Sequence, residues 1–205
     1  MADALIGLIA LPLAGALATL LLPRWKTATA IGTGLASTVA AGLLLFGVAT
    51  QGALHYEIGG WSAGLGIALR ADGLSALLLM MTALVALAAS VYASAYFNTA
   101  SERARFWPLW LLLWTALNAL LLSGDLFNLY VTLELLGLSA VALASLGGKQ
   151  AAVAAALRYL LVGLLGSMMF LAGVSLLYAG YGTLDLAALS HMVAPGPIAW
   201  TALAL

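Results

Sequence analysis

The chain consists largely of long apolar segments that carry almost no charge. Six of these segments are long, and a shorter apolar run begins at 198 and stops at Leu205. A helix needs about 20 apolar residues to cross a bilayer, and lipid offers backbone groups no hydrogen-bond partner outside the helix itself. The sequence therefore predicts an all-α, polytopic transmembrane helix bundle with six full helices and the start of a seventh. The six full segments run approximately over 4–22, 28–49, 73–95, 108–124, 126–146 and 153–179.

The composition excludes several other classes of protein. Hydrophobic residues make up 65% of the chain and charged residues 7%, whereas soluble domains carry about 25% charged residues. The formal net charge is zero, so no basic surface for nucleic acid is expected. The chain has no cysteine, and its two histidines, His55 and His191, lie far apart. We therefore expect no redox centre, no cofactor and no metal site in this chain.

The basic residues predict the orientation of the bundle. Connections on one side of the membrane hold five basic residues, and connections on the other side hold only Arg70. The positive-inside rule places the five in the cytoplasm and the N-terminus outside. We expect a multi-pass protein of the bacterial inner (cell) membrane. The five residues are Arg24, Lys26, Arg103, Arg105 and Lys149.

The longest connection, 53–71, predicts a short external β-hairpin. Apolar residues alternate at both of its ends, around a glycine-rich centre that contains Trp61. We expect Trp61 to lie in the interfacial aromatic belt. Asp72 and Asp125 stand where helices start, which favours a capping role for both carboxylates.

Residues 1–205 are expected to form a single transmembrane domain. The apolar run after 198 is too short to cross a bilayer by itself. The chain is therefore interpreted as a fragment or as the first half of a larger fold, in which either a longer sequence or another chain completes the seventh element.

Two ionisable residues remain inside the predicted helices, Glu134 and Arg158. Glu134 lies nine residues beyond Asp125, roughly 13 Å deeper at 1.5 Å per residue, which is close to the middle of the bilayer. Desolvation disfavours the charged form of a carboxyl, so this group can gain and lose a proton at moderate cost. That property suits a proton relay, although a protonated glutamate bonded to a neighbouring helix is the alternative.

Arg158 lies about six residues into its helix, close enough to the cytoplasmic surface for its side chain to snorkel. Side chains lean toward the N-terminus of their helix, so Glu134 leans outward and Arg158 inward. This argues against a direct salt bridge, while a water chain could still couple the two charges.

Small and polar residues inside the helices have structural interpretations. Gly163 and Ser167 are spaced as in closely packed helix pairs. Asn118, Asn128 and Ser139 can line a hydrated path or form interhelical hydrogen bonds, and the sequence leaves both alternatives open.

Four segments of the chain form a recognisable set of motifs: DGLS at 72–75, SGDLFNLYVTLELL at 123–136, LRYLLVGLLGS at 157–167 and YGTLD at 181–185. They resemble segments of the antiporter-like membrane subunits of respiratory complex I, of Mrp-type cation/proton antiporters and of membrane-bound hydrogenases. The similarity extends over about residues 55–190, with the motifs in the same order.

The resemblance implies specific roles for two residues. Glu134 matches the essential glutamate of the family's fifth helix, and Arg158 matches a basic residue of the sixth helix that is usually lysine. Arginine does not deprotonate, so Arg158 would be a fixed charge that tunes Glu134 rather than a proton carrier. The later lysine- and histidine-bearing helices of the family, and its second half-channel, are not within these 205 residues.

Three functions of different classes follow from these observations. The first is a proton- or cation/proton-translocating subunit of a multisubunit complex, with protons, and sodium as a second candidate, as the ions. The second is a membrane-arm subunit of a quinone-linked or hydrogenase-type oxidoreductase whose redox centres lie in other chains. The third is a scaffold that binds other membrane subunits without conducting ions.

Overall fold

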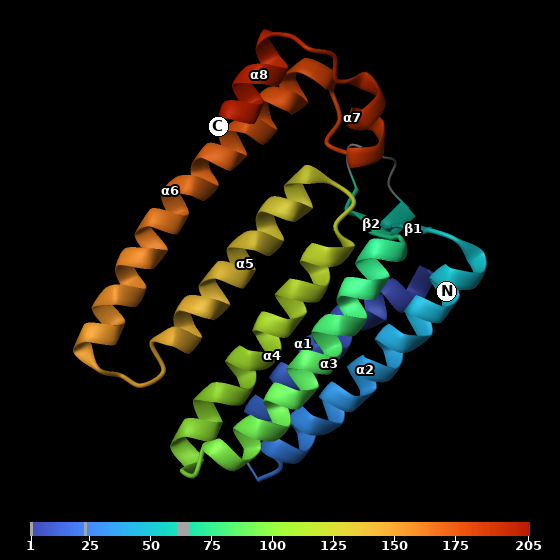
Figure 1. Ribbon diagram of the computed structural model, residues 1–205. Coiled ribbons are helices and arrows are strands. Elements are labelled where there is room, and N and C mark those ends of the chain that lie inside the picture. The colour runs from blue at the N-terminus through green and yellow to red at the C-terminus, as the bar shows by residue number, and fades with distance from the viewer. Residues whose placement is uncertain (1, 23, 61–65) are drawn as a thin grey trace.

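Six long helices form a bundle in the computed structural model, which describes residues 2–22, 24–60 and 66–205 (Figure 1). All six are long and apolar enough to cross a membrane. The predicted helical membrane bundle is confirmed. The long helices are α1 (Ala2–Leu21), α2 (Lys26–Gln51), α3 (Gly73–Tyr96), α4 (Ala100–Leu122), α5 (Leu126–Ala144) and α6 (Gln150–Tyr181).

The start of α4 differs from the prediction by eight residues. The Thr99 hydroxyl accepts a hydrogen bond from the Glu102 backbone N–H, and the Glu102 carboxylate accepts one from the Thr99 N–H, each at 3.2 Å. This capping box begins the helix well before its apolar stretch. Arg103 and Arg105, which the sequence placed in a loop, therefore lie in the first turns of α4.

Helices α1 to α4 form the compact part of the bundle, α5 packs along α4, and α6 packs along the other side of α5 (Figure 1). In the most apolar stretch of each helix, 28–44% of the residues are buried in α1 to α4, but only 6% in α5 and 11% in α6. Helices α5 and α6 thus expose most of their surface. The core between the first four helices contains large buried side chains, among them Leu5, Leu44, Leu79, Trp107 and Leu111.

A proline in α1 is compensated by a side chain from α4. Pro12 lies inside α1 and has no N–H, so the carbonyl of Leu8 loses its usual helical partner. The amide nitrogen of Asn118 donates a hydrogen bond to this carbonyl at 2.8 Å, and Asn118 is 2% exposed. Of the two alternatives for Asn118, the structure has the interhelical hydrogen bond.

The predicted β-hairpin is confirmed over the residues that the structure describes, and its external location stays a prediction. Strands β1 (Leu54–Glu57) and β2 (Ala68–Ala71) pair antiparallel, with Leu54 opposite Ala71. A short 3-10 helix, η1 (Ile58–Gly60), follows β1. Trp61 and the expectation that it lies in an aromatic belt fall outside the described residues.

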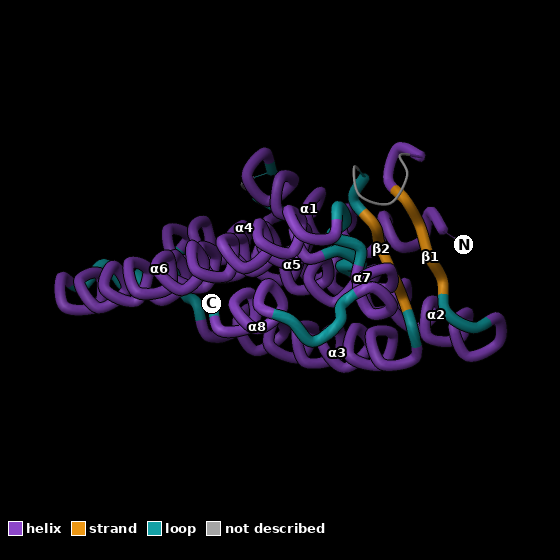
Figure 2. The backbone as a smooth tube through the Cα atoms, turned by 90° about the horizontal axis from the view of Figure 1, so that it is seen from above, coloured by secondary structure: helices purple, strands orange, loops and turns teal. Residues whose placement is uncertain are grey.

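Two short helices follow α6. Helix α7 (Leu186–Met192), which the sequence did not predict, lies near the hairpin in both views (Figures 1 and 2). The Asp185 carboxylate caps it by accepting the Ala188 N–H at 2.7 Å. Helix α8 (Pro197–Ala204) corresponds to the predicted start of a seventh element, and it packs against the outer part of α6.

Backbone hydrogen bonds join the three connections at the hairpin end of the bundle. The Gly124 N–H donates to the Ala68 carbonyl at 2.8 Å, and the Leu126 N–H donates to the Leu184 carbonyl at 3.0 Å. A Cβ added to Gly124 would lie 3.0 Å from the Ala68 oxygen, so a larger residue would push the two segments slightly apart. We call this set of contacts between β2, residues 123–125 and residues 183–186 the outer layer.

Asp125 fixes the start of α5 within the outer layer. One oxygen of its carboxylate accepts the Asn128 N–H at 2.7 Å and the other accepts the Ala68 N–H at 3.1 Å. The predicted capping role is therefore confirmed, and the same side chain also binds the hairpin. Asp72 likewise caps α3, and the hydrogen bond from the Ser75 N–H is the main cause that lowers the pKa of Asp72.

The five basic residues lie in or directly beside the three connections at one end of the bundle, and the hairpin and α7 lie at the other end (Figure 1). We predict that cysteine at Ser101 is protected from an impermeant thiol reagent added outside the cell, and that cysteine at Ser190 reacts. Both positions are exposed, and the chain has no cysteine of its own. Labelling of Ser101→Cys but not Ser190→Cys would invert the topology.

Candidate functional site

Glu134 lies at the middle of α5, which is 19 residues long. The side chain is half-buried. Tyr130 and Leu138, one turn before and after it, share its face of the helix because residues four apart lie above one another. The structure thus places the carboxyl group halfway along an apolar helix that is long enough to span a membrane.

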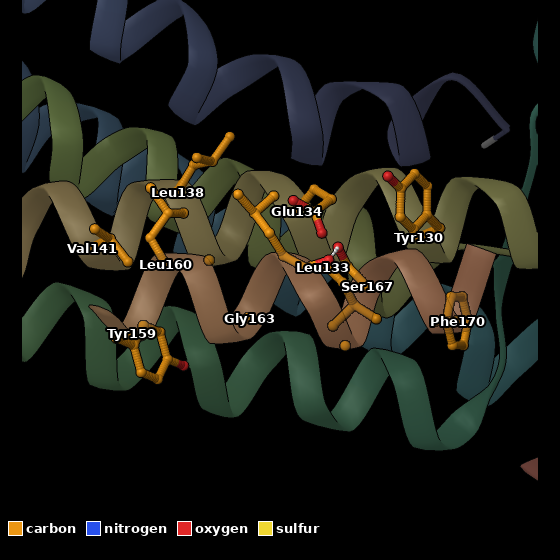
Figure 3. A pocket seen from close by; sticks show the side chains of 13 residues that line it. Tyr130, Leu133, Glu134, Leu138, Val141, Tyr159, Leu160, Gly163, Ser167 and Phe170 are labelled. Carbon is orange, nitrogen blue, oxygen red and sulfur yellow. Dashed lines mark hydrogen bonds between the residues drawn. The ribbon is translucent and has the colours of Figure 1, made fainter. Parts of the chain in front are cut away.

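This face of α5 borders a cavity of about 290 Å³ that lies between α5 and α6 (Figure 3). We call it the Glu134 cavity. Its polar side-chain groups are the carboxyl of Glu134, the hydroxyls of Tyr130 and Tyr159, and the hydroxyl of Ser167. Tyr130 and Phe170 stack with ring centroids 6.5 Å apart at its outer end. The other lining residues are Leu133, Gly137, Leu138, Val141, Leu160, Gly163, Leu164 and Gly166.

Glycines keep this space open at the level of Glu134. A Cβ added to Gly137, Gly163 or Gly166 would have no atom within 4 Å. The sequence predicted close helix packing at Gly163 and Ser167, and that prediction is wrong. Both residues line the Glu134 cavity instead, because α5 and α6 stand apart there.

A second cavity continues the first toward the end of the bundle that holds the basic residues. Its volume is about 490 Å³, and it shares Val141 and Tyr159 with the Glu134 cavity. Alanines of both helices form the remaining wall. Small side chains thus leave space between α5 and α6 from the middle of the helices to the loop that joins them. The alanines are Ala140, Ala144, Ala152, Ala155 and Ala156.

Arg158 lies outside the Glu134 cavity. Its side chain is exposed on α6, beside the exposed Leu161 and Val162. Ser167, which lines the Glu134 cavity, is nine residues further along α6 than Arg158, a helical rise of roughly 13 Å at 1.5 Å per residue. Among the described residues, the single ion pair is Arg70 with Asp72 at 3.7 Å, so none joins Glu134 to Arg158. This agrees with the opposite lean of the two side chains.

Other polar residues of α4 and α5 make local contacts. The Asn128 amide donates to the Ser123 hydroxyl at 3.0 Å, and the Thr132 hydroxyl donates to the Asn128 carbonyl at 2.8 Å. Neither asparagine singled out by the sequence lines the Glu134 cavity. Tyr130 was missed, although its position four residues before Glu134 was a usable signal.

Comparison with known proteins gives the class of this chain. Residues 123–205 match the family model described as "NADH:quinone oxidoreductase/Mrp antiporter, TM". The chain is 41% identical over 143 residues to NADH-quinone oxidoreductase subunit N of Desulforudis audaxviator, an alignment that covers 69% of this chain and 28% of that protein. It is 42% identical over 139 residues to a probable K(+)/H(+) antiporter subunit of Rhizobium meliloti, with 68% and 25% covered respectively.

Two solved structures share the fold. A chain of the membrane-bound sulfane sulfur reductase, an archaeal respiratory membrane complex, superposes with a TM-score of 0.91 at 28% identity, covering 100% of this chain and 43% of that one. A chain of the Mrp complex from Dietzia sp. DQ12-45-1b gives a TM-score of 0.87 at 29% identity, covering 99% and 39%.

The chain is thus a multi-pass membrane protein that resembles the antiporter-like class, as its motifs predicted. More particularly, residues 123–205, which include Glu134 and Arg158, belong to the NADH:quinone oxidoreductase/Mrp antiporter transmembrane family. The aligned part of the chain spans between a quarter and a third of the relatives that it matches.

Proposed function

We propose that this chain is a proton- or cation/proton-translocating membrane subunit of a multisubunit complex, with Glu134 as the intramembrane proton relay. The observation that carries the proposal is a half-buried carboxyl group at the middle of a membrane-spanning helix, beside a cavity between two helices. A midplane acid is costly to insert, and such residues mark ion and proton pathways.

The cavity supports a relay because it offers Glu134 partners for a proton. The Tyr130 and Tyr159 hydroxyls line the same space and can each donate and accept a hydrogen bond, and the Ser167 hydroxyl, which donates to the Leu164 carbonyl at 3.0 Å, can still accept one. The alanine-lined cavity beyond Val141 continues toward the basic end of the bundle. Water in these spaces would link the carboxyl group to that end, which we expect to face the cytoplasm.

The names of the relatives support ion translocation and the presence of partner subunits. Two of them are named as antiporter subunits, one for K(+)/H(+) and one for Na(+)/H(+). Another is an NADH-quinone oxidoreductase subunit. We therefore infer other membrane subunits as partners, and protons, with sodium as a second candidate, as the transported ions. Because of this oxidoreductase relative, a membrane-arm subunit of a quinone-linked oxidoreductase is the second candidate function.

Filling the Glu134 cavity tests the proposal. We expect Gly163→Leu to lower proton-coupled transport severalfold in the reconstituted complex, because the new side chain would occupy space that water needs. Helix stability should not suffer, since no atom lies within 4 Å of the added Cβ and leucine favours helices. The measurement is the rate of pH change inside proteoliposomes, normalised to the amount of assembled complex.

Gly32→Leu is the matched control for this test. Gly32 lies on an exposed face of α2 and also has no atom within 4 Å of an added Cβ. We expect its transport rate to match the wild type. Normal transport by Gly163→Leu would argue against a hydrated path in this cavity and favour the scaffold function.

Arg158 is proposed as a fixed charge that tunes Glu134 through water. If the rise of roughly 13 Å between Arg158 and Ser167, which lines the cavity with Glu134, is taken as the separation, an effective dielectric constant of about 20 gives an interaction of about 1 kcal/mol, or about fivefold in a rate. We expect Arg158→Ala to lower transport by about this factor and Arg158→Lys to preserve it. Transport by both variants is measured against the pH of the medium. An unchanged rate and pH profile in Arg158→Ala would mean that Arg158 only snorkels to the surface.

A further inference from the structure

A basic cavity lies at the end of the bundle opposite the hairpin. Its volume is about 470 Å³, and it is formed where the α1–α2 connection meets the start of α4. Arg24, Lys26 and Arg103 all line it, and none of the described residues that line it is acidic. Three of the seven basic residues of the chain therefore gather around one space.

The basic side chains of this cavity are available to a ligand. Within the described part of the chain, Arg24 and Lys26 form no side-chain hydrogen bond or ion pair. Arg103 uses its Nε to donate to the Phe97 carbonyl at 2.7 Å, which holds the side chain in place and leaves its two terminal nitrogens for other acceptors. The nearby Glu102 is occupied by its capping bonds with Thr99.

The start of α2 adds further donors at the same place. Trp25 is the N-cap residue of α2 and provides no side-chain cap, so the first amides of the helix have no side-chain acceptor. The amides of Lys26, Thr27 and Ala28 belong to residues that line the cavity. Free amides at a helix start attract negative charge. Together with the three cations they form a site suited to a phosphate group.

An apolar surface continues from the basic cavity along α2. Ile31 lines the cavity, and the side chains that follow it on the same face are 53–70% exposed. Trp25, which is 66% exposed, stands at the junction between the charged and apolar parts, as tryptophans do at the headgroup level. The exposed apolar residues are Leu35, Val39, Leu43 and Phe46.

We propose that this cavity binds the headgroup of an anionic phospholipid, with the phosphate between Arg24, Lys26 and Arg103 and an acyl chain along α2. The combination of a cationic cavity with a continuous apolar stripe distinguishes a phospholipid from a free phosphate ion, which has no use for the stripe. This inference is independent of the function proposed for Glu134, since the site involves neither α5 nor α6.

Native mass spectrometry of the 205-residue chain with titrated phosphatidylglycerol or phosphatidylcholine tests the proposal. Each basic residue near the bound phosphate should strengthen binding by about fivefold. We expect phosphatidylglycerol to bind more tightly than phosphatidylcholine by well over fivefold, and Arg24→Gln/Lys26→Gln to reduce the difference to the roughly fivefold that Arg103 alone supports. Arg103 is left unchanged because its bond to Phe97 contributes to the local structure.

Two further double variants make the result decisive. Arg105→Gln/Lys149→Gln removes two exposed charges from the same end of the bundle but outside this cavity, and should keep the preference. Arg24→Lys/Lys26→Arg retains both charges and should also keep it. An equal loss in both glutamine variants would show diffuse surface attraction and overturn the site. Displacement of phosphatidylglycerol by equimolar inorganic phosphate would overturn the assignment to a lipid.

Discussion

Glu134→Gln is expected to insert and assemble like the wild type and to lose most proton-coupled transport, at least about tenfold, because an amide cannot exchange a proton. The amide is similar in size to the carboxyl group and less costly to bury, so the fold around α5 should not change. Glu134→Asp should retain part of the activity, since the acid survives on a side chain one methylene shorter. The assay is transport into proteoliposomes, normalised to assembled complex.

Glu57→Gln provides the matched control for this substitution. Glu57 carries the same side chain on the exposed face of the hairpin, outside the membrane-spanning helices. Its replacement should leave transport unchanged. If Glu134→Gln transports at the wild-type rate, Glu134 is not a relay, and its role is that of a hydrogen-bonding group in helix packing.

Asn118→Leu is expected to destabilise the bundle by about 1–2 kcal/mol, or roughly five- to thirtyfold in the folding equilibrium. Leucine is close to asparagine in size but cannot donate to the Leu8 carbonyl, which Pro12 leaves without a helical partner. That carbonyl would be unsatisfied where no water reaches it. Reversible unfolding in mixed micelles at increasing fractions of dodecyl sulfate measures the difference.

Pro12→Ala separates this hydrogen bond from other effects of the substitution. Alanine at position 12 supplies the N–H that the Leu8 carbonyl lacks in the wild type. In that background Asn118→Leu should lower the free energy of unfolding much less than it does in the wild type. Equal costs in the two backgrounds would show that the asparagine does not act through the Leu8 carbonyl.

The sequence predicted the features that repeat along the chain. Uniform apolar segments require helices in lipid, so the six spans followed directly from hydropathy. The hairpin and the carboxylate caps at Asp72 and Asp125 also have short-range signals, because strand alternation and capping depend on neighbouring residues. The position of Glu134 at the middle of its helix could be predicted because the helix start at Asp125 has a local signal and rise per residue is constant.

Features that depend on the distance between helices were not predictable in the same way. Gly163 and Ser167 have the spacing of a close helix contact, yet they line open space. The distance between α5 and α6 depends on the packing of the whole bundle, which the spacing of two residues does not encode. The start of α4 was misplaced because hydropathy does not register the Thr99–Glu102 capping box. The partner of Asn118 is 110 positions away, a distance over which no local pattern operates.

The outer layer also implies an order of events during synthesis. Its members come from three separate connections: β2, residues 123–125 and residues 183–186. The Asp125 carboxylate can bind the Ala68 N–H only after α4 has inserted, and the Leu126 bond to the Leu184 carbonyl needs α6 as well. Helices α1 to α4 can therefore associate while the ribosome is still adding the rest. The remaining bonds at this end of the bundle, from Leu126 to Leu184 and from Leu186 to Gly124, form only when the segment after α6 arrives there.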